Sequence, residues 1–235
     1  YLGKVKKVVP GLNAAFVNVG HEKDGFLHYL DLGPNVNSYK KFTDKAITKK
    51  SNTASLKNFK KEKEIDKTGQ ITDVLKSGDR ILVQVSKEAI SSKGPRLTTE
   101  ISIAGRNMVL LPFFNKISLS NKIKSQEEKV RLKRLLQSIK PQGFGVIVRT
   151  VAKGKKVIEL DANLKILYKK WQSVFKELKN AEAPQMILKE LNRSTAILRD
   201  ILNEGFNSIH VNDKDLYLEL KDYLTSISPD QEKIL

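Results

Sequence analysis

The first hundred residues alternate between apolar and polar positions, with the two-residue period of a β-strand. This pattern predicts five strands, over residues 5–9, 14–19, 25–28, 80–86 and 96–102. Pro10-Gly11 and Gly20 separate the first three strands, which therefore form an antiparallel meander. Five strands with one long connection between the third and the fourth are typical of a small oligonucleotide-binding barrel. We expect such a barrel over residues 1–103.

The long connection, residues 33–69, follows neither a strand period nor a helix period. Residues 40–67 within it contain ten lysines against four acidic residues. We interpret residues 33–69 as a Lys-rich, mostly unstructured and flexible insertion that leaves the barrel as a loop. A membrane-binding role for it is disfavoured, because its apolar residues form no sustained stripe that an interfacial helix could bury.

Beyond Gly105 the apolar residues take the spacing of a helix. Ser125 and Glu128 match a capping box at the start of a helix with a basic outer side. The pattern then predicts strands over residues 145–151 and 156–160, and a long helix over about 161–180.

The end of the chain has the pattern of a small α/β unit. Ser194 can cap a helix that Gly205 terminates, and a strand over 206–211 and a helix over 213–226 follow. This unit is too short for an independent domain, so we expect part of it to lie outside the chain. The chain also opens on Tyr1 rather than Met, which favours a piece of a longer protein.

Charge narrows the class of partner. The 235 residues contain 43 Lys and Arg against 26 Asp and Glu, a net charge of +17, which exceeds what solubility requires. Nucleic acid is the favoured partner, because its phosphates release counterions on pairing with Lys and Arg; an anionic membrane surface is the competing interpretation. No apolar run reaches the roughly 18 residues of a membrane span and no signal peptide is visible, so we expect a cytoplasmic protein.

Two groups of residues could bind RNA. Phe16 and Phe26 lie on adjacent strands, where an exposed ring offers a flat face to a base, although core packing is an equal alternative. Lys93 lies in a Gly-containing loop beside Arg96, an arrangement suited to a phosphate contact, although a loop lysine is commonly just solvated.

Arg149 and Thr150 come near the end of an apolar strand, where a guanidinium and a hydroxyl can bind one phosphate together. A surface ion pair is the alternative for Arg149. The sequence has no nucleotide-binding glycine motif, its three histidines are scattered, and it has no cysteine for a disulfide or a thiolate zinc site. Asp213 and Asp215 could hold Mg²⁺, but capping of a helix start explains them better.

Four segments, taken in order, carry a resemblance to a known family. They are GKVKKVVPGLNAAFVNVGHEKDGFLH, LTTEISIAGRNMVLLP, GFGVIVRTVAKGKK and the helix ending in KKW. They resemble successive blocks of the bacterial ribonucleases E and G, and they span nearly the whole chain apart from the Lys-rich insertion. The resemblance implies an α+β multi-domain fold. In it, residues 1–103 form an S-one-type oligonucleotide-binding barrel, 104–193 an α/β sensor region for an RNA 5′ monophosphate, and 194–235 part of an RNase H-like subdomain.

The resemblance also implies roles for single residues. Phe16 and Phe26 match family aromatics that contact RNA, and Lys93 matches a lysine beside them. Arg149 and Thr150 match the pair that holds the 5′ phosphate.

Gly105 and Val109 match positions that line the same pocket. Some relatives have two consecutive arginines where this chain has Asn121 and Lys122, so Lys122 is expected to replace the missing cation only in part.

The function that the resemblance implies is RNA binding and 5′-end sensing within an endoribonuclease of RNA processing and decay. The family's Mg²⁺-binding aspartates and its zinc-linking cysteine pair come after the point where this chain ends. We therefore expect no catalytic residue, metal or cofactor in the chain, no cleavage by it alone, and an oligomer for the parent enzyme. The alternative is a non-catalytic, single-stranded RNA-binding or translation-associated protein that uses the same barrel.

Overall fold

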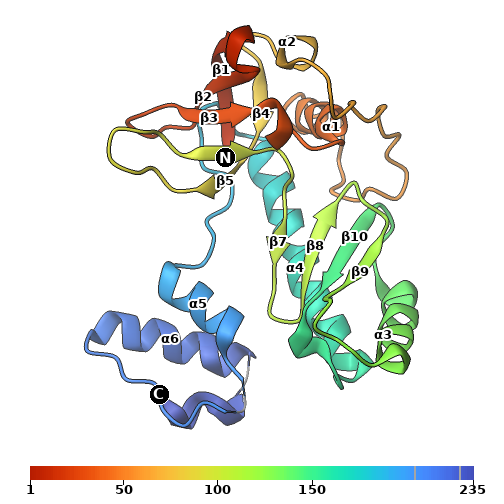
Figure 1. Cartoon of the computed structure of the whole chain (residues 1–235), viewed down its shortest axis with the longest axis vertical. Coiled ribbons are helices and arrows are strands. Elements are labelled where there is room, and N and C mark those ends of the chain that lie inside the picture. Colours follow the sequence, from red (N-terminus) through yellow and green to blue (C-terminus); the bar gives the residue numbers. More distant parts are fainter. Residues whose placement is uncertain (204, 228) are drawn as a thin grey trace.

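The computed structural model describes residues 1–203, 205–227 and 229–235. Over these residues the chain is a mixed α+β protein with two β-sheets and six α-helices (Figure 1). The strands are β1 (Leu2–Val9), β2 (Ala14–Asn18), β3 (Gly25–His28), β4 (Arg80–Leu82), β5 (Gln84–Lys87), β6 (Arg96–Thr98), β7 (Ile103–Ala104), β8 (Met108–Pro112), β9 (Ile117–Leu119) and β10 (Phe144–Val148). The helices are α1 (Val36–Ile47), α2 (Ile71–Val74), α3 (Gln126–Ile139), α4 (Val157–Leu178), α5 (Arg193–Ile201) and α6 (Lys214–Ile227). Short 3-10 turns cover Pro10–Leu12, Tyr29–Asp31, Thr150–Ala152 and Pro229–Ile234.

The first sheet is a curled half-barrel with the strand order β4-β1-β2-β3-β6-β5. The expected meander of β1, β2 and β3 is confirmed. The strand expected over 80–86 is divided at Val83 into β4, which pairs with β1, and β5, which pairs with β6. The two outermost strands are therefore consecutive in the chain, and this connection curls the sheet. Its inner face is filled by buried side chains, among them Val5, Ala15, Val17, Leu27 and Leu97.

The second sheet has the order β7-β8-β10-β9, with α3 beside β9 and α4 packed on β8 (Figure 1). Strand β10 confirms the strand predicted over 145–151 in part: it starts one residue earlier and ends at Val148, and Thr150–Ala152 form a 3-10 turn. The strand expected over 156–160 is wrong, because α4 begins at Val157. Glu159 explains this start: its side chain accepts a hydrogen bond from the Lys156 amide at 2.9 Å and so caps the helix.

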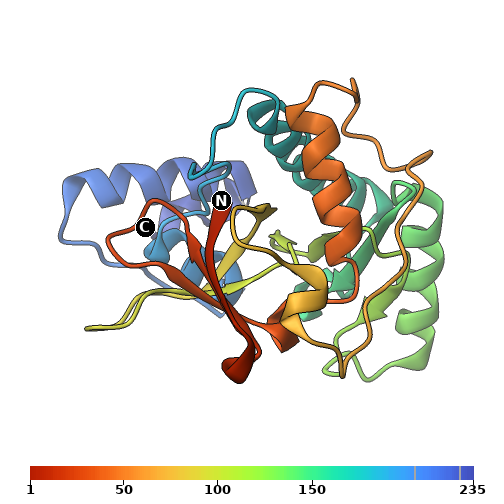
Figure 2. The same ribbon diagram turned by 90° about the horizontal axis from the view of Figure 1, so that it is seen from above.

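The lysine-rich segment contains a helix, so the expectation of an unstructured insertion is wrong for its first third. Helix α1 buries Val36, Tyr39, Phe42 and Ala46, a stripe at helical spacing, and its lysines lie outside this stripe. Figure 2 shows α1 lying alongside α4. The residues after α1 have little regular structure, yet Ala54 and Leu56 are buried and the Trp171 indole donates to the Ala54 carbonyl oxygen at 2.8 Å.

The last part of the chain contains α5 and α6, which share a small apolar cluster of Leu198, Leu202, Leu220 and Leu224. Both expected helices are confirmed, although Asn192 rather than Ser194 caps α5, and α5 ends at Ile201, before the expected stop at Gly205. Residues 206–211 form no strand among the residues described. Within this segment, the Ile209 amide makes one backbone hydrogen bond of 2.7 Å to the Ile234 carbonyl oxygen.

Candidate nucleic-acid interface

Two phenylalanines stand side by side on the outer face of the curled sheet. Phe16 on β2 and Phe26 on β3 are direct partners in the antiparallel register, and their ring centroids lie 5.7 Å apart at an interplanar angle of 66°. Their neighbours Ala15, Val17 and Leu27 point to the other face and are buried. Both rings are half-buried and stay outside the sheet's apolar core. The structure therefore favours display over core packing.

Cations flank the aromatic pair on the same face. Side chains of register partners share a face, and Lys7 is paired with Phe16, Arg96 with Phe26, and Lys87 with Arg96. A row of five residues thus crosses β1, β2, β3, β6 and β5, and we call it the aromatic row. Its Arg96 is held by a two-pronged ion pair, with Nε and Nη2 at 2.9 and 3.1 Å from the Asp31 carboxylate oxygens.

Lys93 lies in the exposed loop between β5 and β6, close to the start of β3. A Cβ on the neighbouring Gly94 would stand 2.1 Å from the Asp24 carbonyl oxygen, so only glycine allows the loop to approach the β2–β3 turn so closely. The Phe26 amide then donates to the Pro95 carbonyl oxygen at 2.8 Å. The loop thus fixes Lys93 beside the strand that carries Phe26.

The five predicted phosphate-site residues meet at one end of the second sheet. In its register Val148, the last residue of β10, is paired with Met108 at the start of β8 and with Leu119 at the end of β9. The residues in question follow these strand ends or lie next to them; they are Gly105, Val109, Lys122, Arg149 and Thr150.

Hydroxyl and backbone groups tie this end together. The Arg149 amide donates to the Asn107 carbonyl oxygen at 2.9 Å, and the Thr150 and Ser120 hydroxyl oxygens lie 3.2 Å apart. The Lys122 amide donates to the same Ser120 hydroxyl oxygen at 3.3 Å. Gly105 approaches α4 so closely that an added Cβ would stand 3.0 Å from Leu167 Cδ2. The Ser120 and Thr150 hydroxyls therefore lie next to each other at this end of the sheet, beside the backbone of Lys122 and Arg149.

The Arg149 side chain already has a partner, since Nη1 is hydrogen-bonded to the Asp200 carboxylate on α5. The surface ion pair that the sequence left open as an alternative is thus present. Asp200 also accepts from Arg199 Nε at 2.9 Å. Burial alone would raise the pKa of the Asp200 carboxyl, but the hydrogen bonds from Arg199 and Arg149 lower it below its usual value. A ligand of Arg149 must compete with this carboxylate.

Glu128 fixes helix α3 to the loop before α4, next to the same end of the sheet. Its carboxylate accepts two hydrogen bonds from Arg131, each of 2.7 Å, and one of 2.8 Å from the Gly154 amide. Ser125 caps the helix as expected, accepting from the Glu128 amide at 3.2 Å. The hydrogen bonds from Arg131, and then that from Gly154, lower the pKa of the Glu128 carboxyl to about 2.

Replacing Glu128 with glutamine is expected to lower the free energy of unfolding by about 2 kcal/mol at pH 7. In the folded chain the carboxyl stays ionised down to about pH 2, whereas its ordinary pKa is 4.5. Its contribution is therefore complete above pH 4.5 and is lost as the pH falls toward 2. Urea titrations at several pH values measure this effect. Glu127→Gln in the same turn is the control, and an equal loss in both variants would mean that the helix dipole, not the ion pair, is responsible.

Metal-binding groups do not gather in the described part of the chain, where no cluster of three or more His, Cys, Asp or Glu is found. These residues do not fit a Mg²⁺ centre. Asp213 accepts from the Leu216 amide at 2.7 Å, so the capping interpretation of that aspartate is confirmed.

In the described part of the chain, no helix combines the length and the apolar character that crossing a bilayer demands.

Comparisons with known proteins show the family of this chain. The model of the "Ribonuclease E/G family" matches residues 102–235, which is more than half of the chain. The chain belongs to the ribonuclease E/G family. Ribonuclease E of Nostoc is 35% identical over 98% of this chain and 30% of its own length. A ribonuclease E/G-like protein of Pyropia yezoensis is 34% identical over 95% of the chain and 38% of its own length. Ribonuclease G of Haemophilus influenzae is 30% identical over 98% and 43%.

The chain thus spans between 30% and 43% of the length of these ribonuclease E/G relatives. The matched regions cover nearly all of this chain and therefore span both of its sheets. Three residues at the end of the second sheet were not singled out from the sequence: Ser120, Asn107 and Asp200. Only Ser120 had a local signal, because it directly precedes the Asn121-Lys122 pair that the resemblance had marked.

Proposed function

We propose that this chain is the RNA-binding and 5′-monophosphate-sensing segment of an endoribonuclease that hydrolyses single-stranded RNA. In this proposal the catalytic Mg²⁺ site of the enzyme lies outside these 235 residues. The ribonuclease names of its relatives support the RNA substrate. The net charge of +17 supports a phosphate-rich partner.

The aromatic row carries the proposal. Two displayed rings with cations on both sides combine a base-stacking platform with partners for the adjoining phosphates. A base can stack on a ring only when it is free of its own helix, so this surface selects single-stranded RNA over a duplex. The curled sheet is consistent with the S-one-type barrel that the family resemblance implies, and we propose that residues 1–103 are that domain.

The end of the second sheet supplies the proposed sensor. A terminal phosphate monoester carries more negative charge than an internal diester, and the planar fork of Arg149 can bind two of its oxygens. The Thr150 hydroxyl and the Lys122 ammonium add a neutral donor and a second charge, while Gly105 and Val109 form the walls. On binding, the phosphate replaces the Asp200 carboxylate at Arg149.

Phe16→Ala and Phe26→Ala are each expected to weaken RNA binding by roughly 1–3 kcal/mol, because each deletes one stacking surface. The melting temperature should change little, since neither ring belongs to the apolar core. Fluorescence anisotropy with a 5′-hydroxyl oligouridine measures the affinity, and circular dichroism measures the melting. Tyr217→Ala, which removes an exposed ring of α6 outside the aromatic row, is the control.

A different result would reject the role of the row. If the two phenylalanine variants melt at lower temperature while each folded molecule binds RNA as tightly as before, the rings support the fold. If Tyr217→Ala weakens binding as much as they do, the loss of any surface aromatic has the same effect and the row is not a binding platform.

A further inference from the structure

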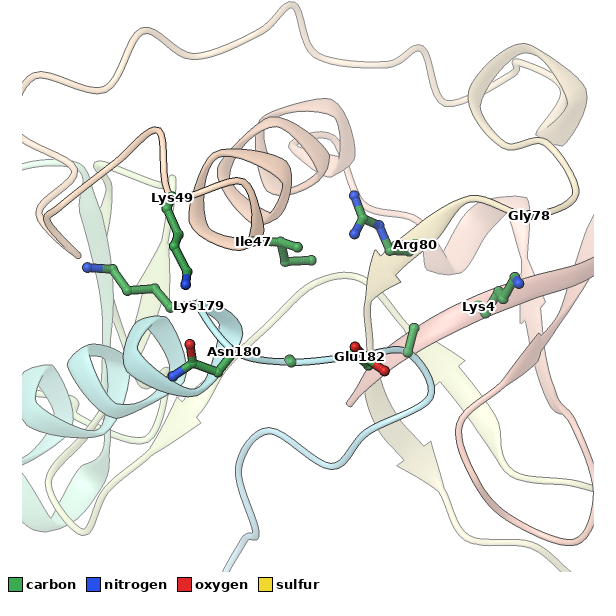
Figure 3. A pocket seen from close by; sticks show the side chains of 10 residues that line it. Lys4, Ile47, Lys49, Gly78, Arg80, Lys179, Asn180 and Glu182 are labelled. Carbon is green, nitrogen blue, oxygen red and sulfur yellow. The ribbon is translucent and has the colours of Figure 1, made fainter.

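A basic cleft of about 570 Å³ lies between the end of α1, the strands β1 and β4, and the segment that follows α4. Four cations line it, and Glu182 is the one carboxylate in its lining; the cations are Lys4, Lys49, Arg80 and Lys179. Figure 3 shows Lys49 and Lys179 at one end of the cleft and Lys4 and Arg80 at the other, with Ile47 and Glu182 between them. The lining thus has an excess of positive charge.

The register of the sheet explains why cations stand there. Leu2 on β1 is paired with Leu82 on β4, and both side chains are buried in the core that α1 and α4 share with the second sheet. Two residues further along the same face, Lys4 is paired with Arg80. Beyond the Leu2–Leu82 pair, the outer face of the sheet is no longer covered by the apolar core. The next pair of side chains therefore lines the cleft.

The cleft cations have few acidic partners. Arg80 Nη2 lies 3.6 Å from the Asp44 carboxylate, a long contact to a largely exposed residue. Among the described residues, Lys4, Lys49 and Lys179 have no carboxylate within 4 Å. Lys179 instead lies over the Phe175 ring, with Nζ 5.0 Å from the centroid. Like charges brought together without partners favour a bound anion.

The cleft continues the aromatic row along β1. Lys7, the partner of Phe16, is only three residues from Lys4, a distance of roughly 10 Å along a strand. The register shift between Val5 and Lys7 also places an extra residue, the exposed Lys6, between them. A chain of lysines therefore connects the two displayed rings to the cleft.

We propose that this cleft is a second RNA site, which binds the phosphate backbone of a single strand as the strand leaves the aromatic row. The proposal rests on the RNA-binding role proposed above and adds a path to it. Its residues are cations without a stacking ring, so it binds backbone without selecting bases. Only a strand long enough to reach from the row to the cleft can use both.

The test compares a double variant, Lys4→Ala with Lys179→Ala, and a control, Lys133→Ala with Lys169→Ala. The control removes the same charge from exposed lysines of α3 and α4 outside the cleft. Two 5′-hydroxyl oligouridines are used, one of about 4 and one of about 12 nucleotides, the range that such domains bind. A 5′ hydroxyl keeps the proposed phosphate sensor out of the measurement.

For the longer RNA, the cleft variant is expected to bind about tenfold more weakly, with the slope of log affinity against log salt smaller by about 1.4, the value for two lost phosphate contacts. For the shorter RNA, binding should change by less than about twofold. Three results would overturn the cleft site. They are an unchanged affinity of the cleft variant for the longer RNA, an equal loss of affinity for both RNA lengths, and an equal loss of affinity in the control variant. A Phe16→Ala variant that binds the shorter RNA normally would instead reject the aromatic row, and the length dependence would still decide on the cleft.

Discussion

Phe42→Ala is expected to lower the free energy of unfolding by about 3–5 kcal/mol, the cost of deleting a large aromatic side chain from a packed core. The side chain is 2% exposed, and its ring is stacked on Trp171 with 4.9 Å between centroids. Phe113 and Phe175 pack around it at 5.7 and 5.6 Å. Removing it leaves a cavity that these rings cannot fill. Urea unfolding followed by tryptophan fluorescence measures the loss.

Lys45→Ala, an exposed change in the same helix, is the matched control and should stay within about 0.5 kcal/mol of the parent chain. If Phe42→Ala costs no more than this control, α1 adds nothing to the core, and the lysine-rich segment is the loose loop that its composition suggests.

Arg149→Ala is expected to remove most of the preference for RNA with a 5′ monophosphate over the same RNA with a 5′ hydroxyl. A charge-assisted hydrogen bond contributes about 1.5–3 kcal/mol, which corresponds to roughly tenfold discrimination or more. Thr150→Val should remove a smaller share, because it deletes only a neutral donor. Asp200→Asn should act in the opposite direction, since it weakens the carboxylate that competes for Arg149. Competition binding with the two forms of one short oligonucleotide gives each ratio.

Arg134→Ala, which deletes an exposed arginine from α3, is the control for Arg149. If Arg149→Ala weakens the binding of both RNAs alike, the guanidinium is a general backbone contact. If Asp200→Asn leaves the monophosphate affinity unchanged, the carboxylate only holds α5 in place and does not compete with the ligand.

Local patterns of the sequence predicted much of the fold. The alternation around Phe16 and Phe26 fixed both strands and the opposite orientation of their neighbours. The cap at Ser125 fixed the start of α3. These features depend on residues close in the chain, whose spacing is visible without any knowledge of distant partners.

The errors arose where distant residues decide. Helix α1 carries its own apolar stripe, but the density of lysines concealed it, and the aromatic rings that bury Phe42 come from as far away as Trp171. At Val157 and Ile158, two β-branched residues suggested a strand, whereas both side chains are exposed on the first turn of α4. The Arg149–Asp200 pair joins residues 51 positions apart, and no local pattern could reveal it.

The single residue between β4 and β5 also limits how the length of this chain can vary. Before this residue, Arg80–Leu82 is paired with β1; after it, Gln84–Lys87 is paired with β6. Adding or deleting one residue at Val83 would turn the side chains of one of these two strands to the opposite face of the sheet. Side chains of the inner core would then be exposed. The exposed loop between β5 and β6 can absorb such a change at its tip, beyond the Ile90–Lys93 bridge, because an added residue there shifts no strand pairing. Insertions are therefore compatible with the tip of this hairpin but not with its first strand.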